Sequence, residues 1–243
     1  MADIDFTNKF VYRANKFYEK AEVYRKEENY KLAVENYLQA IMFDKNNPDF
    51  YVGLAKVYKY TKNYQKAISF LKKAELLDDK NPNIKKELSM CYIGEENYCQ
   101  GIQYLVKAIR LEPENVDNQL QLAMLHEMIE EDDMALMIYQ KIIETNPDYI
   151  RAYIQKATLY MHQEDYLNSA KMFKIVIKLK PDYYRAYLAL GICYDKLNNS
   201  VGAKRFYKKY LTLNKLAPNY YDITQRIFSL SNDKESVIEL RIV

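Results

Sequence analysis

The sequence predicts an all-α protein built from tandem helix hairpins. Two observations support this prediction: a motif recurs every 34 residues, and Gly and Pro are scarce, with 5 and 6 among 243 residues. The motif occupies residues 30–33, 64–67 and 98–101, and each copy begins with Tyr and ends with Ala or Gly. Further steps of 34 reach Ala135, Ser169 and Ala203 without an insertion. The chain therefore divides into six repeats, at residues 14–47, 48–81, 82–115, 116–149, 150–183 and 184–217.

Each repeat, numbered from 1 to 34, carries two helical stripes. Apolar residues at positions 4, 7, 8 and 11 predict a first helix, and those at 20, 24 and 27 predict a second. Positions 8 and 20 are always Ala, Gly or Ser, which lets the two helices approach closely. Position 11 is Tyr in five repeats, so we expect the tyrosines to form core. Position 32 holds Pro113, Pro147 and Pro181, where a helix must end.

This pattern resembles the tetratricopeptide repeat (TPR), a helix–turn–helix unit of 34 residues. The resemblance covers residues 14–217 and implies a right-handed α-α superhelix, a TPR solenoid whose first helices line a concave groove. Departures occur at position 4, with Lys85 and Gln119, and at position 7, with Lys20 and Lys156. We expect slightly looser hairpin packing at these four residues.

The two ends flank the repeats. Residues 1–13 predict an N-terminal helical extension, and residues 218–243 predict a capping helix followed by an apolar tail. In the capping helix, Tyr221 and Phe228 restart the pattern at positions 4 and 11, so we expect them to face inward. The apolar tail, residues 237–243, would continue the cap or dock into a groove.

Catalytic and metal-binding patterns are missing from the sequence. Three dispersed cysteines do not form a disulfide framework or a zinc module, and they indicate a reducing compartment. The two histidines are 36 residues apart, and His126 at position 11 is expected to be a buried, hydrogen-bonded core residue. The acidic run 130–133 is interpreted as a solvated loop. We therefore expect no enzyme activity, no cofactor and no metal.

Targeting and membrane signals are missing as well. The first residues carry two aspartates where a signal peptide needs basic residues and an apolar run. No stretch approaches 18 consecutive apolar residues, so no membrane span is expected. These observations predict a cytoplasmic protein.

A candidate peptide-binding groove follows from the first helices. Positions 2, 5, 9, 12 and 13 face away from the packing stripe, and from the third repeat onward many of them are apolar. The alternative is that neighbouring first helices bury these side chains. The predicted groove residues are Lys56, Lys59, Lys86, Met90, Ile93, Leu120, Met124, Met128, Ile154, Met161, Leu188 and Ile192.

The best-known TPR binding mode is not expected here. The resemblance implies that a chaperone carboxylate clamp needs Lys at position 5 and Asn at position 9 of one repeat. Lys86 is the one Lys at position 5, and Met90 stands at its position 9. We therefore predict no chaperone carboxylate clamp.

Charge is unevenly distributed along the chain. Residues 82–149 hold 5 basic and 13 acidic side chains, whereas residues 150–243 hold 16 and 8. The basic excess includes an outer stripe on the second helices of the last two repeats. No aromatic residue interleaves this stripe for base stacking, so we do not expect nucleic acid as a partner. The stripe consists of Lys171, Lys174, Lys178, Arg205 and Lys208.

Two functions are consistent with these features. The first is a non-catalytic adaptor that binds a peptide or helix of a partner protein in the concave groove. The alternative is a structural scaffold that assembles into a homo-oligomer through charge-complementary ends or the C-terminal tail. The sequence identifies neither the partner nor the oligomeric state.

Overall fold

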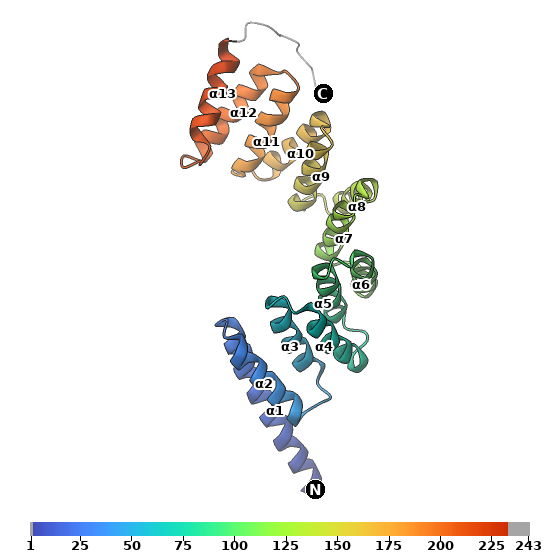
Figure 1. The fold of residues 1–243 in the computed structure, drawn as a ribbon. Coiled ribbons are helices and arrows are strands. Elements are labelled where there is room, and N and C mark those ends of the chain that lie inside the picture. Colours follow the sequence, from blue (N-terminus) through green and yellow to red (C-terminus); the bar gives the residue numbers. More distant parts are fainter. Residues whose placement is uncertain (1, 233–243) are drawn as a thin grey trace. The chain divides into compact units, whose positions relative to one another are not determined.

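A computed structural model describes residues 2–232 of the chain. In this part of the chain the backbone forms 13 α-helices and no strand (Figure 1). The helices are α1 (Ala2–Lys26), α2 (Tyr30–Phe43), α3 (Pro48–Tyr60), α4 (Tyr64–Leu77), α5 (Pro82–Gly94), α6 (Tyr98–Leu111), α7 (Val116–Met128), α8 (Asp132–Thr145), α9 (Ile150–His162), α10 (Tyr166–Leu179), α11 (Tyr184–Lys196), α12 (Ser200–Leu213) and α13 (Tyr220–Asn232). The predicted all-α class is confirmed.

The helices gather into two compact units, Met1–Leu125 and His126–Val243, which we call the N-terminal unit and the C-terminal unit. The division falls inside α7. In the N-terminal unit the hairpins α1–α2, α3–α4 and α5–α6 pack in sequence, and α3 also contacts the first helices on either side, α1 and α5. In the C-terminal unit the hairpins α9–α10 and α11–α12 stack in the same way, and α13 packs on α12. Each unit is thus a solenoid of stacked helix hairpins, as predicted.

The small residues of positions 8 and 20 lie inside these hairpins. All twelve are buried, which is the condition for close approach of the two helices. Ser89 Oγ donates to the carbonyl of Gly101 in the same hairpin at 2.8 Å, whereas Ser169 Oγ accepts from Cys193 Sγ of the next repeat at 3.4 Å. Both buried serine hydroxyls therefore have a hydrogen-bond partner.

The turn between the two helices of each repeat has one conformation throughout. Position 15 adopts a left-handed backbone with φ between 56° and 61° in all six repeats, at Glu28, Lys62, Glu96, Glu130, Glu164 and Asn198. The next N–H, at position 16, donates to the carbonyl of position 11 at 2.8 to 2.9 Å, which closes the first helix. In five repeats the side chain at position 16 then caps the second helix. Glu131 stands there in the fourth repeat and makes no such cap.

Glycine at position 15 should stabilise the protein. A left-handed conformation costs an L-residue about 1–2 kcal/mol, whereas glycine adopts it without steric cost. We expect Lys62→Gly to raise the free energy of unfolding by about 0.5–1 kcal/mol after the entropic cost of glycine is subtracted. Lys73→Gly, at an exposed site within α4, should lower it by about 1 kcal/mol. Urea unfolding followed by circular dichroism measures both, and destabilisation by Lys62→Gly would contradict the proposed strain.

Two expectations about local structure are wrong. Asp132 and Asp133 are not in a loop but form the first turn of α8, where carboxylates interact favourably with the helix dipole. In α13, Tyr221 and Phe228 do not face inward: both are exposed, and Tyr221 is 71% accessible. The helix instead packs through Ile223, Ile227 and Leu230, one and two turns apart.

The sequence predicts a helical extension at the N-terminal end, and a capping helix with an apolar tail at the C-terminal end. α1 begins at Ala2, so residues 2–13 continue the first helix of the first repeat. Arg226 of α13 forms a bidentate ion pair with Asp195 of α11, with hydrogen bonds of 2.6 and 2.8 Å. This pair links α13 to the sixth repeat. The predicted apolar tail, residues 237–243, lies outside the described residues.

Candidate peptide-binding surface

The first helices of the N-terminal unit carry a surface on which cations and apolar side chains meet. Lys56 and Lys59 lie on α3, while Lys86 and Met90 lie on α5. Glu87 of α5 is nearly buried, and its carboxylate accepts a hydrogen bond from Lys59 Nζ at 2.6 Å. The same carboxylate lies 3.9 Å from Lys56 Nζ. Two of the three predicted groove lysines therefore share one nearly buried carboxylate, which leaves Lys56, Lys59 and Glu87 together a net charge of one.

Methionines form the accessible apolar part of this surface. Met90 on α5 and Met124 on α7 occupy position 9 of consecutive repeats, and they are 38% and 37% exposed. Ile93, one turn after Met90, is half-buried. Lys59 Nζ lies 3.6 Å from Met90 Sδ, so the cation and the thioether are in direct contact. This unit therefore offers flexible apolar side chains beside a partly neutralised basic pair.

In the C-terminal unit the predicted groove residues are less accessible. Met128 is exposed, but the other four are half-buried and pack against the hydrophobic core of the unit. These four are Ile154, Met161, Leu188 and Ile192. The structure thus places them partly inside, as expected if neighbouring helices cover them.

Leu120 is a correction to the predicted groove. Its side chain is fully buried, so it offers no surface to a ligand. Leu120 occupies position 5, and Val52 at the same position of the second repeat is also buried. In the other four repeats the side chain at position 5 is half-buried, so burial at this position differs between repeats and the helical periodicity of one repeat does not predict it.

The tyrosine at position 24 of three repeats donates a hydrogen bond to a carboxylate on the first helix of its own repeat, a feature that the sequence analysis missed. The hydroxyl of Tyr37 donates to Glu22, that of Tyr139 to Glu127, and that of Tyr207 to Asp195 at 3.2 Å. In each pair the acid lies at position 9 or 12 of the first helix of the same repeat. Repeats with Leu or Phe at position 24 carry no acid at either position. This correlation could have been found in the sequence.

The pKa values of these groups follow from burial and from each other. Burial, followed by the hydrogen bond to Glu22, raises the pKa of the Tyr37 hydroxyl far above its usual range. Burial alone would raise the pKa of Glu22, but hydrogen bonds from Arg25 and Tyr37 outweigh it and lower the pKa. Among the described residues no Lys or Arg forms an ion pair with Glu127, and burial raises the pKa of this carboxyl. The surface carboxylate in the first repeat is therefore firmly ionised at neutral pH.

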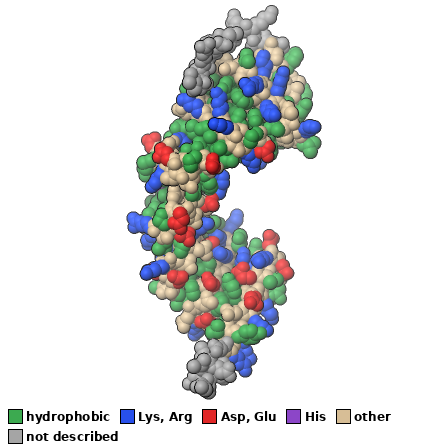
Figure 2. Space-filling model, turned by 180° about the vertical axis from the view of Figure 1, so that it is seen from behind, with side chains coloured by type: hydrophobic (Ala, Val, Ile, Leu, Met, Phe, Trp, Pro, Cys, Tyr) green, Lys and Arg blue, Asp and Glu red, His purple; other side chains and the backbone are tan. Residues whose placement is uncertain are grey.

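The basic outer stripe is exposed on α10 and α12. Four of its five residues are exposed, and Lys174 is half-buried. Figure 2 shows Lys and Arg side chains spread over the surface at the C-terminal end of the chain. Lys174 and Arg205 lie over the rings of Tyr194 and Phe206, 5.6 and 5.8 Å from their centroids. Both rings are buried, so they are not available to stack on a nucleic-acid base.

Among the described residues no group of three or more His, Cys, Asp and Glu side chains could hold a metal ion. His126 is buried, and its Nδ1 lies 2.6 Å from Glu131 Oε2, which confirms the predicted hydrogen-bonded core histidine. Within residues 2–232 no helix has the length and apolar content that crossing a membrane requires.

Comparison with known proteins identifies the repeat. One model described as TPR repeat matches residues 21–61, and three described as tetratricopeptide repeat match residues 48–81, 117–149 and 154–220. Together they cover more than half of the chain. No match to a curated protein was found.

Solved structures share the fold. The C-terminal part of a TPR repeat-containing protein from Cytophaga hutchinsonii superposes with a TM-score of 0.76 at 17% identity, covering 89% of this chain and 90% of that one. PilF of Pseudomonas aeruginosa gives 0.66 at 15% identity, over 89% and 99%. YrrB, described as a TPR protein with an unusual peptide-binding site, gives 0.59 at 21% identity, over 79% and 100%. From the 34-residue register, the stacked hairpins and these matches, we conclude that the chain belongs to the tetratricopeptide repeat family.

Proposed function

We propose that this protein is a non-catalytic adaptor that binds a peptide or helix of a partner protein on the first helices of its N-terminal unit. The observation that carries the proposal is the exposure of Met90 and Met124 at equivalent positions of consecutive repeats. Exposed methionines beside a cationic rim suit an adaptable peptide-binding surface. Lys56, Lys59 and Lys86 would orient an acidic flank of the ligand.

Two further observations support this proposal. YrrB, a structure of the same fold, is described as having a peptide-binding site. Burial raises the pKa of the Cys91 thiol to about 12, which makes this cysteine a poor nucleophile and fits a non-catalytic role. A cytoplasmic location stays a prediction.

Peptide selection followed by paired substitutions tests the proposal. Ligands would be selected from a random peptide library displayed on phage, and their affinities measured by fluorescence anisotropy. We expect Met90→Asp with Met124→Asp to weaken binding at least tenfold, because a carboxylate in an apolar contact must be desolvated.

The control uses exposed methionines on second helices. Met42 lies on α2 and Met137 on α8, and both are more exposed than Met90. Met42→Asp with Met137→Asp adds the same charge and should leave the affinity within about twofold. Equal loss in both double variants, or loss in neither, would remove Met90 and Met124 from the binding surface.

Self-assembly is the second candidate. It is supported by the acidic and basic segments of the chain and by the exposed Tyr221 and Phe228 on α13. Light scattering coupled to size-exclusion chromatography at low and high salt separates the candidates. A mass of 29 kDa under both conditions would exclude self-assembly, whereas a larger species that salt dissociates would support it.

A further inference from the structure

Position 4 of the repeat normally closes the junction with the preceding repeat. In three repeats its side chain donates a hydrogen bond to the backbone carbonyl at position 32 of the repeat before. These bonds run from Tyr51 to Lys45 at 3.0 Å, from Gln119 to Pro113 at 2.7 Å and from Tyr187 to Pro181 at 3.1 Å. In the third repeat position 4 is Lys85, which instead reaches Glu75 Oε1 at 2.7 Å. The junction between the second and third repeats is therefore built differently.

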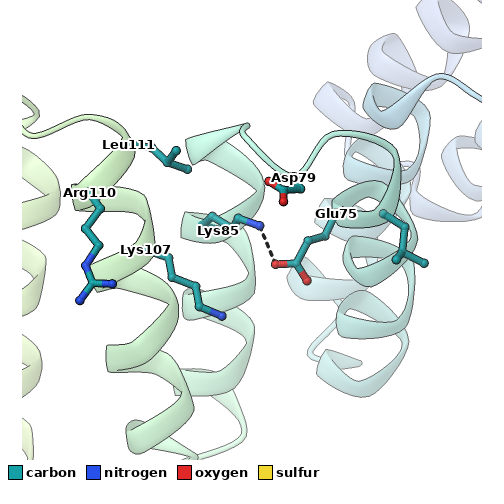
Figure 3. A pocket seen from close by; sticks show the side chains of 7 residues that line it. Glu75, Asp79, Lys85, Lys107, Arg110 and Leu111 are labelled. Carbon is teal, nitrogen blue, oxygen red and sulfur yellow. Dashed lines mark hydrogen bonds and ion pairs between the residues drawn. The ribbon is translucent and has the colours of Figure 1, made fainter.

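A pocket of about 660 Å³ lies at this junction. It is lined by residues of α4, α5, α6 and the α4–α5 loop, all within the N-terminal unit. Figure 3 shows Lys85 on α5 directed toward Glu75 on α4, with Lys107 and Arg110 on the neighbouring α6. The substitution of an aromatic ring by a lysine chain at position 4 accounts for the open space.

The acid at the base of the pocket is already neutralised. One oxygen of Glu75 accepts a hydrogen bond from Lys85 Nζ at 2.7 Å, and the other accepts one from Lys72 Nζ at 3.0 Å. Burial alone would raise the pKa of Glu75, but the hydrogen bonds from these two lysines outweigh it and lower the pKa. Lys72 also contacts the hydroxyl of Tyr104. Glu75 therefore has no charge left to neutralise a further cation.

Lys107 and Arg110 are not neutralised in this way. They are exposed, lie one turn apart on α6, and form no ion pair with any carboxylate in the described part of the chain. Lys107 Nζ lies 4.5 Å from the centroid of the Tyr104 ring, which fixes its position at the pocket wall. The planar guanidinium of Arg110 can donate two parallel hydrogen bonds to one carboxylate. Figure 3 shows Lys107 extending toward the Lys85–Glu75 pair and Arg110 extending from the other side of α6, so the exposed Arg110 side chain must turn for both cations to contact one anion.

Apolar side chains border the same pocket. Leu76 at the end of α4 is 86% exposed, and Leu111 at the end of α6 is also exposed. An exposed leucine on each side of a basic pocket would contact a large apolar side chain next to the anionic group. The one unpaired acid in the lining, Asp79, lies on the α4 side, away from Lys107 and Arg110 (Figure 3).

We propose that this pocket is a second peptide-binding site, which takes an acidic side chain of a partner protein flanked by large apolar residues. The carboxylate would pair with Lys107 and Arg110, and the apolar neighbours would contact Leu76 and Leu111. This site is formed by α4, α5 and α6, and it goes beyond the proposed methionine surface on the first helices.

Nuclear magnetic resonance titration of the full chain with defined peptides tests the proposal. The probe is the blocked peptide Ser-Leu-Glu-Leu-Ser, and its control replaces Glu by Gln. We expect the Glu peptide to shift the amide signals of Leu76, Asp79 and residues 107–111, and the Gln peptide to bind at least fivefold more weakly. Equal binding of both peptides, or shifts confined to other regions, would overturn the proposal. Stronger shifts with inorganic phosphate than with the peptide would assign the pocket to phosphate instead.

Matched variants separate the pocket from general charge. Lys107→Ala with Arg110→Ala should weaken the Glu peptide about five- to tenfold. Lys209 and Lys178 occupy the same two register positions in later repeats and are also exposed, so Lys178→Ala with Lys209→Ala removes equal charge and should change nothing. Asp79→Asn should strengthen binding about twofold because it removes a repulsive charge. If the Lys107 and Arg110 variant and the Lys178 and Lys209 variant weaken peptide binding equally, the proposed site is wrong.

A last variant fills the pocket without deleting charge from α6. Lys85→Tyr restores the aromatic ring at position 4, where its hydroxyl can reach the carbonyl of Asp79, the equivalent of Lys45 and Pro181. We expect loss of the Glu-dependent shifts with no fall in the melting temperature. The Met90→Asp and Met124→Asp variant should retain these shifts, so failure of the methionine surface and failure of this pocket are distinguishable.

Discussion

Replacing Tyr37 by alanine is expected to lower the free energy of unfolding by about 4 kcal/mol, within the range for a large aromatic residue removed from a core. Tyr37 is fully buried at position 24 and packs so closely against α3 that a Cβ placed on Gly53 would clash with its ring. The ring therefore fills a space shared by the first and second repeats. Guanidinium unfolding followed by circular dichroism at 222 nm measures the change.

The two contributions of Tyr37 can be separated. Tyr37→Phe keeps the ring and removes only the hydroxyl that donates to Glu22, which retains Arg25 as a partner, so the cost should be about 1 kcal/mol. Tyr12→Ala truncates an exposed tyrosine of the same helical hairpin and should cost less than about 0.5 kcal/mol. A loss below 1 kcal/mol for Tyr37→Ala would show that the first repeat does not depend on this ring.

The hairpin core could be predicted from the sequence because each of its features recurs. A residue such as Ala67 carries little information alone, but small residues in all six repeats at one register position indicate a helix crossing. His126 could be interpreted in the same way, since it replaces a tyrosine of known register. Repetition therefore substitutes for the alignment of homologues that fold prediction ordinarily needs.

Surfaces formed between repeats could not be predicted in this way. The helical wheel of one repeat places Leu120 outside, yet its side chain is fully buried. The same reasoning places Tyr221 and Phe228 inside, because they continue positions 4 and 11 of the repeats, yet both side chains are exposed on α13. Burial at these residues depends on which helix is adjacent, and the period alone does not contain that information.

The unusual lysines illustrate the same limit. The sequence marks Lys85 and Lys156 as departures from the pattern and predicts looser packing. In the structure both are nearly buried, and each has a specific partner: Glu75 for Lys85, and Gln140 at 2.6 Å for Lys156. Each partner lies on the second helix of the preceding repeat, so the pairing becomes visible only after the repeats are stacked.

Removing the negative charge of Glu75 should lower the free energy of unfolding strongly. Glu75→Gln leaves Lys85, which is nearly buried, without a compensating charge. Loss of one partner from a fully buried pair costs about 3–5 kcal/mol, and the partial exposure of Glu75 reduces this to about 2–3 kcal/mol. Glu35→Gln on the exposed side of α2 removes the same charge and should cost less than about 0.5 kcal/mol.

The pH dependence of stability provides an independent check on Glu75. Its pKa in the folded protein lies below the ordinary value of 4.5, because Lys85 and Lys72 outweigh the effect of burial. The ion pair therefore contributes stability that is fully present above about pH 4.5 and is lost as the pH falls through the folded pKa. The free energies of unfolding of the wild-type protein and Glu75→Gln should differ at pH 7 and converge in acid. A difference that stays constant down to pH 3 would mean that the glutamine disturbs packing rather than charge.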